Sequence, residues 1–146
     1  MRLTRFTDYG LRTMIFLAVQ KKNVRVTVQD IVDCYDLPRD HVTKVVHRLG
    51  ILGYLETTRG KHGGIRFAMS PDQVNVGEFV RQVEPTLTPI DCESPPCRLS
   101  SNCRLRSALS EASHAFVAVL QKYTLADLVA DRNTVRGLLG QCPVPR

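Results

Sequence analysis

Apolar residues in the first third of the chain recur at three- and four-residue steps, the spacing of one buried face of an α-helix. The pattern predicts helices over residues 4–20, 26–34 and 39–52. Pro38 comes just before the third helix, where a helix start tolerates proline. A short helix, a tight turn and a longer amphipathic helix predict a helix-turn-helix motif.

Two short runs of strand-forming residues follow, at residues 54–58 and 65–69. They predict a β-hairpin whose tip, RGKHGG at residues 59–64, is rich in glycine and basic residues. A hairpin directly after a helix-turn-helix predicts a winged helix, in which the basic tip reaches DNA phosphates beside the recognition helix. The alternative is a solvated hairpin on an unrelated small domain, which the order of the two motifs disfavours.

The second half of the chain predicts a short helix over residues 75–83 and a long helix from 102 or 103 to 123. The long helix carries a seam of apolar and small residues, namely Leu105, Ala108, Leu109, Ala112, Ala115, Phe116, Val119 and Leu120. We interpret this seam as a dimerisation surface of coiled-coil type. Packing against its own domain is the alternative.

The predicted fold is therefore mainly α, in four segments. Residues 1–84 form the winged helix-turn-helix domain, and residues 85–104 form a cysteine-bearing loop. Residues 103–131 form the dimerisation helix and a following short helix, and residues 132–146 form a weakly ordered tail.

Positive charge is concentrated in the first half, since residues 1–70 hold 12 of the 20 Lys and Arg residues but only 6 of the 14 Asp and Glu residues. This distribution predicts that the first half binds an acidic partner, most simply double-stranded DNA. On the third helix, Thr43, Lys44 and His47 are candidates for base edges, and Arg39 and Arg48 for phosphates. On the hairpin tip, the candidates for DNA contact are Arg59, Lys61 and His62.

No apolar run approaches the roughly 18 residues of a membrane span, and the N-terminus lacks the pattern of a signal peptide. We therefore expect a cytoplasmic protein with reduced thiols and no membrane partner. The sequence contains no Ser–His–acid grouping, phosphate loop or paired carboxylates, so we do not expect an enzyme.

Three cysteines, Cys92, Cys97 and Cys103, lie within twelve residues in a loop that Pro95 and Pro96 keep from becoming helical. Flanking arginines favour thiolates, the form of cysteine that binds metals. The loop predicts a metal or cluster site with one ligand missing. A zinc site and a thiol-only redox switch remain alternatives.

The other two cysteines lie outside this loop. Cys34, near the end of the second helix, is expected to be a small core residue. Cys142 is expected to be exposed and uninvolved.

Three stretches carry a family resemblance: LTRFTDYGLR near the start, the hairpin RGKHGGIR, and CESPPCRLSSNCRLRSAL in the loop. They resemble the Rrf-type winged-helix transcription regulators, over nearly the whole chain from residue 2 to residue 139. Within that family the chain is most similar to the repressors that sense nitric oxide. Relatives that regulate iron–sulfur assembly have a histidine three residues after the third cysteine, where this chain has Arg106.

The resemblance implies a homodimer with one iron–sulfur cluster in each protomer, held by the three loop cysteines. It further implies that Asp8 of the partner protomer is the fourth ligand, although Asp8 is otherwise a simple first-turn acid of its helix. A four-iron (4Fe-4S) cluster is expected rather than a 2Fe-2S cluster. The implied function is repression of transcription from a DNA operator, relieved when nitric oxide attacks the cluster.

Overall fold

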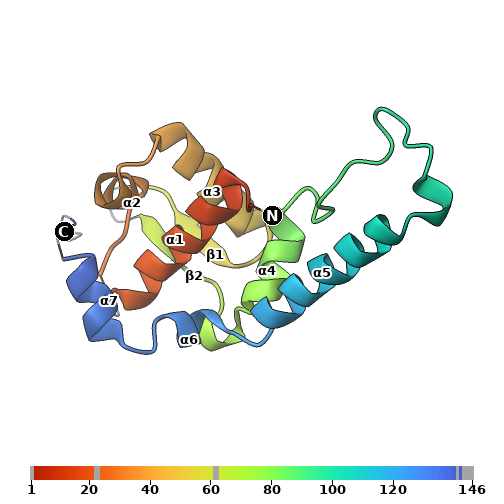
Figure 1. Cartoon of the computed structure of the whole chain (residues 1–146). Coiled ribbons are helices and arrows are strands. Elements are labelled where there is room, and N and C mark those ends of the chain that lie inside the picture. Colours follow the sequence, from red (N-terminus) through yellow and green to blue (C-terminus); the bar gives the residue numbers. More distant parts are fainter. Residues whose placement is uncertain (1, 22–23, 61–62, 141, 143–146) are drawn as a thin grey trace.

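The computed structural model describes residues 2–21, 24–60, 63–140 and 142 of the chain. Its fold is the mainly α-helical winged helix that the sequence predicts (Figure 1). The helices are α1 (Arg5–Val19), α2 (Val28–Tyr35), α3 (Arg39–Ile51), α4 (Val76–Val83), α5 (Arg104–Leu120), α6 (Leu125–Leu128) and α7 (Arg132–Leu138). The strands are β1 (Leu55–Thr58) and β2 (Gly64–Phe67).

Local side-chain chemistry sets where the first two helices begin. The Thr4 side chain accepts a hydrogen bond from the backbone N–H of Thr7 at the start of α1. At the start of α2, Thr27 and Asp30 form a capping box in which each side chain binds the backbone N–H of the other. Asp36 ends α2 in the left-handed conformation, with φ of 50°.

The core lies where α1 crosses the helix-turn-helix and α4 (Figure 1). Its largest fully buried side chains include Phe16, Phe79, Met14, Ile31 and Leu49. Each such side chain contributes roughly 1.5–3 kcal/mol when it leaves water. Helix α1 also contacts α6 and α7, so it packs against helices from both ends of the chain.

The wing is an antiparallel hairpin whose register runs from Leu55 opposite Phe67 to Thr58 opposite Gly64. The hairpin is joined to the segment before α2 by a 2.7 Å hydrogen bond from Ile65 N–H to the Val26 carbonyl. Its tip turns through Gly60, whose φ of 99° favours glycine. The wing is therefore fixed to the same core as α3.

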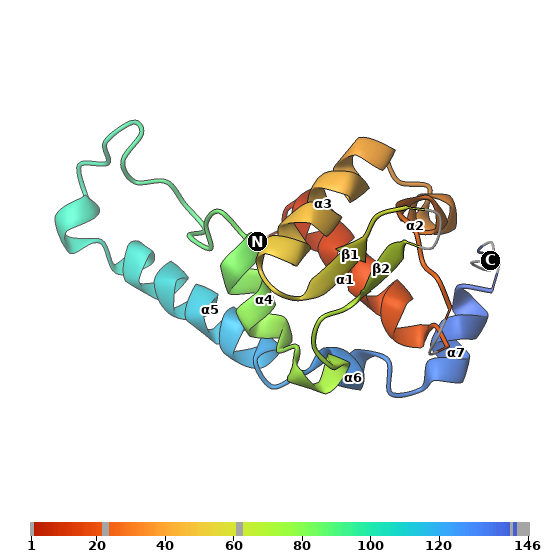
Figure 2. The same ribbon diagram turned by 180° about the vertical axis from the view of Figure 1, so that it is seen from behind.

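Helix α5 projects away from this core, and the segment that joins it to α4 runs beyond the body of the domain (Figures 1 and 2). One side of α5 packs towards the body and another is exposed, and the predicted seam includes residues of both, since its members Leu109, Phe116 and Leu120 are partly buried. Ser113 and Val117 are buried towards the body, and the Ser113 hydroxyl donates a hydrogen bond to the Leu87 carbonyl. The opposite stripe is exposed and consists of Leu105, Ala108, Ala112, Ala115 and Val119.

The prediction of a weakly ordered tail is wrong for the part of it that the structure describes. Residues Arg132–Leu138 form α7, which Asp131 caps by accepting a hydrogen bond from Thr134 N–H. Arg136 donates a hydrogen bond to the carbonyl of Val19, the last residue of α1. A cationic donor suits the free carbonyls at a helix C-terminus, so α7 is anchored there. Among the described residues, no helix is long and apolar enough to cross a membrane.

Gly77 allows α4 to approach the end of α5 closely. A Cβ atom at this position would lie 2.6 Å from the backbone N of Gln121 and 2.9 Å from its Cα. We expect Gly77→Ala to lower the free energy of unfolding by about 1–3 kcal/mol, because backbone atoms must move. Thermal unfolding measures the change.

Gly137→Ala is the matched control, since nothing lies within 4 Å of a Cβ at that helical position. Alanine is the better helix former, so this variant should be neutral or slightly stabilised. Equal melting temperatures for the two variants would contradict the close approach of α4 and α5.

Candidate functional site

The outer face of α3 presents a continuous set of polar and basic side chains to solvent. The predicted contacts Arg39, Thr43, Lys44, His47 and Arg48 are all exposed. The opposite face is buried in the core through Val42, Val45, Val46 and Leu49. The structure thus brings all five predicted residues together on one face of α3. An α-helix has a diameter that a DNA major groove accepts.

Two of these side chains are positioned by neighbours. Arg39 donates a hydrogen bond to the side-chain oxygen of Gln29, an exposed residue of α2 that the sequence did not single out. The Thr43 hydroxyl donates to the Arg39 carbonyl at 2.9 Å, which leaves its oxygen free to accept. Gln29 therefore belongs to the same surface as the recognition helix.

On the wing, Arg59 is exposed next to the turn at Gly60. The predicted contacts Lys61 and His62 lie outside the described residues. Arg66 makes a 2.8 Å ion pair with Glu56 across the two strands, on the exposed side of the hairpin. This pair stabilises the hairpin little, because both partners are largely in water.

The three loop cysteines are free thiols, two of them partly buried and Cys97 exposed. The loop folds back on itself through a 3.0 Å hydrogen bond from Cys97 N–H to the Cys92 carbonyl. Cys103 is the N-cap of α5, and its sulfur accepts a hydrogen bond from Arg106 N–H at 3.4 Å.

The donor set fits an iron–sulfur cluster chemically, because thiolates are the ligands such clusters use. The geometry within one protomer is incomplete. Within residues 2–21, 24–60, 63–140 and 142, no group of three or more His, Cys, Asp or Glu side chains converges to hold a metal ion. Cys92 alone of the three lines the cavity of about 650 Å³ between the loop and α5, together with Arg81, Arg106 and His114.

Asp8 lies in the first turn of α1 and pairs with Arg12 at 2.9 Å, each side chain being 43% exposed. This hydrogen bond is the main cause of the raised pKa of Arg12. The Arg12 guanidinium also lies 5.8 Å from the ring centroid of Tyr35, whose pKa burial raises to about 12. Asp8 is therefore accessible, but it already has a cationic partner that the sequence analysis missed, although the i, i+4 spacing indicates it.

Two contacts connect the first turn of α1 with other parts of the site. Glu84, at the end of α4 and the start of the loop, accepts hydrogen bonds from Thr4 N–H at 2.7 Å and from the Thr4 hydroxyl at 3.1 Å. The ring of Tyr9 lies 6.1 Å, centroid to centroid, from that of His41 in α3. The root of the loop, the helix that carries Asp8 and the recognition helix are thus in direct contact.

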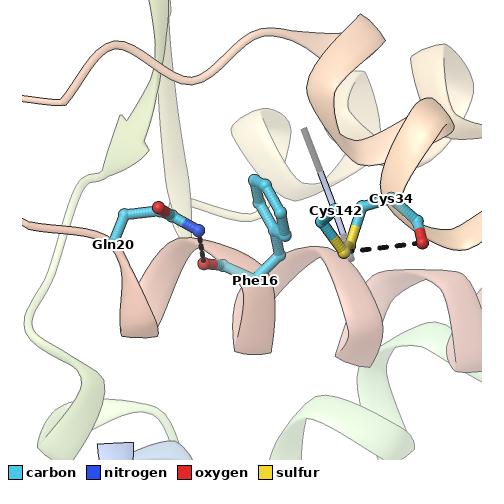
Figure 3. The surroundings of a disulfide bond; sticks show 4 residues. All are labelled: Phe16, Gln20, Cys34 and Cys142. Carbon is cyan, nitrogen blue, oxygen red and sulfur yellow. Dashed lines mark hydrogen bonds between the residues drawn. A yellow bond between two sulfur atoms is a disulfide. The ribbon is translucent and has the colours of Figure 1, made fainter. Parts of the chain in front are cut away.

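The remaining two cysteines correct the sequence-based expectations. Cys34 and Cys142 form a disulfide, shown in Figure 3, so Cys142 is not an uninvolved tail residue. Cys34 does pack beside the core, as a partly buried residue. The sequence could not reveal the pairing, because 108 positions separate the two cysteines.

Together, the winged helix, the basic outer face of α3 and the cysteine loop define a DNA-binding transcription regulator rather than an enzyme. A family model described as "Rrf2: Iron-dependent Transcriptional regulator" matches residues 3–131. The chain belongs to the Rrf2 family. It is 43% identical over 142 residues to the HTH-type transcriptional regulator NsrR of Shouchella clausii, covering 95% of each chain. It is 42% identical to the NsrR of Bacillus subtilis, covering 95% of this chain and 97% of that one.

Solved structures support the fold. The B. subtilis global cysteine regulator CymR has a TM-score of 0.64 at 25% identity, covering 89% of this chain and 97% of that chain. IscR of T. potens has a TM-score of 0.72 at 22% identity, covering 90% of this chain and 88% of that chain. The latter likeness establishes the fold alone.

The Thr4–Glu84 contact generates a stability prediction. Glu84→Ala leaves the partly buried Thr4 N–H without its acceptor, so we expect a loss of about 1–3 kcal/mol in the free energy of unfolding. The first turn of α1 should also exchange its amide hydrogens faster, which hydrogen exchange with mass spectrometry measures.

Glu111→Ala, which removes an exposed carboxylate from α5, is the matched control. It should change neither the melting temperature nor the exchange of α1. If both variants behave alike, Glu84 does not hold the first turn of α1.

Proposed function

We propose that this protein is an iron–sulfur-dependent transcriptional repressor that binds its operator as a homodimer and releases it in response to nitric oxide. The observation that carries the proposal is the presence of three free thiols in one loop, at the end of a helix that projects from a DNA-binding domain. The 42–43% identity to regulators named NsrR supports the same function.

The exposed stripe on α5 supports the homodimer. Its five residues follow one another at steps of three, four, three and four, which is the a/d spacing of a coiled-coil seam. Leu105 is 61% exposed and Val119 is 50% exposed, so the stripe leaves large apolar side chains in water in the single chain. Pairing two copies about a two-fold axis would bury this stripe against itself, with alanines allowing close approach.

Cys92, Cys97 and Cys103 would hold the cluster, with the partner's Asp8 as the fourth ligand. The loop projects away from the body that contains its own α1 (Figure 2), which favours a carboxylate supplied in trans. To serve as a ligand, Asp8 must give up or share its ion pair with Arg12. A 4Fe-4S cluster, when bound, supplies iron that nitric oxide can attack, most readily at the iron with the carboxylate ligand.

The contacts of α1 connect the cluster-binding loop with the helix that binds DNA. When the partner's loop holds Asp8, the first turn of α1 is fixed, and Tyr9 transmits that position to His41 on α3. The two recognition helices of the dimer then keep the spacing of half-sites one DNA turn apart, roughly 34–36 Å. When Asp8 returns to Arg12, this constraint is lost and operator affinity falls.

The free-energy difference that the switch requires is consistent with this mechanism. Changing operator occupancy from 99:1 to 1:99 requires about 5.5 kcal/mol of preference between the two states. Loss of several ligand bonds to Cys92, Cys97 and Cys103 can supply that preference. A single shifted hydrogen bond, which contributes about 0.5–1.5 kcal/mol, cannot.

The first test replaces one loop cysteine. Cys97→Ser should lose the iron and sulfide that the reconstituted wild-type protein retains, and its operator affinity should fall by about 10³-fold towards non-specific binding. Metal analysis and fluorescence anisotropy with labelled DNA measure the two quantities.

Cys142→Ser is the matched control, since it removes a cysteine outside the loop and should retain both the cluster and the operator affinity. Operator affinity that survives in Cys97→Ser would contradict the coupling between loop and DNA.

The second test separates base recognition from phosphate contact on α3. Lys44→Ala should reduce discrimination between operator and altered operators by about 1–3 kcal/mol. Arg48→Ala should weaken binding to all DNA sequences by the same factor and lower the slope of log affinity against log salt by about one.

Lys122→Ala, an exposed lysine just beyond α5, controls for net charge and should do neither. If Lys44→Ala and Arg48→Ala exchange these behaviours, the assignment of the two side chains is wrong.

A further inference from the structure

A second pair of cysteines lies far from the loop. Cys34, in the last turn of α2, is bonded to Cys142, just beyond α7, with 4.4 Å between their Cα atoms. Figure 1 shows α7 on the opposite side of the molecule from the cysteine loop. The two sets of thiols can therefore react independently, and this inference does not depend on the proposed function.

The bond joins the C-terminal segment to the helix-turn-helix. Val135 and Leu139 pack partly buried against the core, and Arg136 donates to the Val19 carbonyl at the end of α1. Cys34 stands beside Tyr35, whose ring meets Phe16 of α1 edge-on with 6.3 Å between centroids. The disulfide consequently fixes α7 to α2 as well as to α1.

The surroundings accommodate the reduced form as well. The sulfur of Cys142 lies 3.6 Å from the carbonyl oxygen of Cys34, the dashed contact in Figure 3. A disulfide sulfur has no proton to donate, whereas a Cys142 thiol would find this acceptor in place. Both cysteines are partly exposed, so a small oxidant or reductant can reach them.

We propose that Cys34 and Cys142 form a thiol redox site, separate from the loop cysteines, whose oxidation locks α7 against the DNA-binding domain. Peroxide is the oxidant. One thiolate attacks one oxygen of the peroxide, the O–O bond breaks, and the cysteine becomes a sulfenic acid that keeps that oxygen. The other oxygen leaves as hydroxide and takes a proton to become water. The second thiolate attacks the sulfenic sulfur, forms the S–S bond and releases a second water. Two electrons pass to peroxide, and a dithiol reductant returns the two thiols.

The disulfide should raise the stability of the domain, because it closes most of the chain into a loop and so restricts the unfolded ensemble. In the reduced protein, α7 is held by the contacts of Val135, Leu139 and Arg136. Without a covalent link, a seven-residue helix held by these side chains should open locally, at a lower free energy than the whole domain. Oxidation therefore changes α7 from a locally opening element to one that opens only with the whole domain.

The test uses the full chain with Cys92, Cys97 and Cys103 replaced by serine, which leaves Cys34 and Cys142 as the only thiols. Stoichiometric hydrogen peroxide should lower the mass by about 2 Da through loss of two hydrogens, without forming a dimer. It should raise the melting temperature by at least about 5 °C. Trypsin should cut at Arg132 and Arg136 about tenfold more slowly. Dithiothreitol should reverse all three changes.

The control adds Cys142→Ser to that variant and should show no peroxide-dependent shift in melting temperature or cleavage. The untreated wild-type protein, compared with and without dithiothreitol, should show the same cleavage difference, which keeps the test valid if the serine variants fold poorly. A disulfide between two chains, or an internal disulfide that leaves both cleavage and melting temperature unchanged, would overturn the proposal.

Discussion

The packing of α1 against α3 is the contact on which the rest of this structure depends. Helix α1 supplies buried residues such as Met14 and Phe16 to the core, and α3, which packs against α1, supplies Val42 and Leu49. This burial fixes the recognition helix by its inner face and leaves its basic outer face in water. It also places Asp8, Tyr9 and the capping residue Thr4 at one end of α1, beside α3 and the start of the loop.

The chain consequently consists of two regions with different features. The first region, residues 1–84, carries a net charge of +4, with 13 Lys and Arg against 9 Asp and Glu, and it includes the exposed basic face of α3. The projecting helix α5 and the loop before it hold the thiols and an apolar stripe that the single chain leaves exposed. Glu84, the last residue of the first region, binds Thr4 at the start of α1, so the beginning of the loop is tied directly to α1.

The sequence was informative wherever the physical cause is local. Apolar spacing predicts α1, α3 and the outer face that holds Lys44 and Arg48, and the capping box predicts the start of α2. The sequence contained no signal where the cause is a contact between distant segments. Glu84 binds Thr4 across 80 positions and Cys34 binds Cys142 across 108, and no local pattern marks either pair. Small and apolar residues occur on both faces of α5, so the sequence did not separate the face that packs on the domain from the exposed stripe. Only tertiary packing distinguishes Ser113 from Ala112.

The coupling of the loop to DNA is tested most directly by titrating nitric oxide into the anaerobically reconstituted protein bound to fluorescent operator DNA. The visible absorption band and the anisotropy are followed in the same cuvette, after iron and sulfide have been counted. We predict about four irons and four sulfides per protomer, and a band that bleaches in step with the release of DNA. A protein that binds no iron, or a band that bleaches while the DNA stays bound, would contradict it.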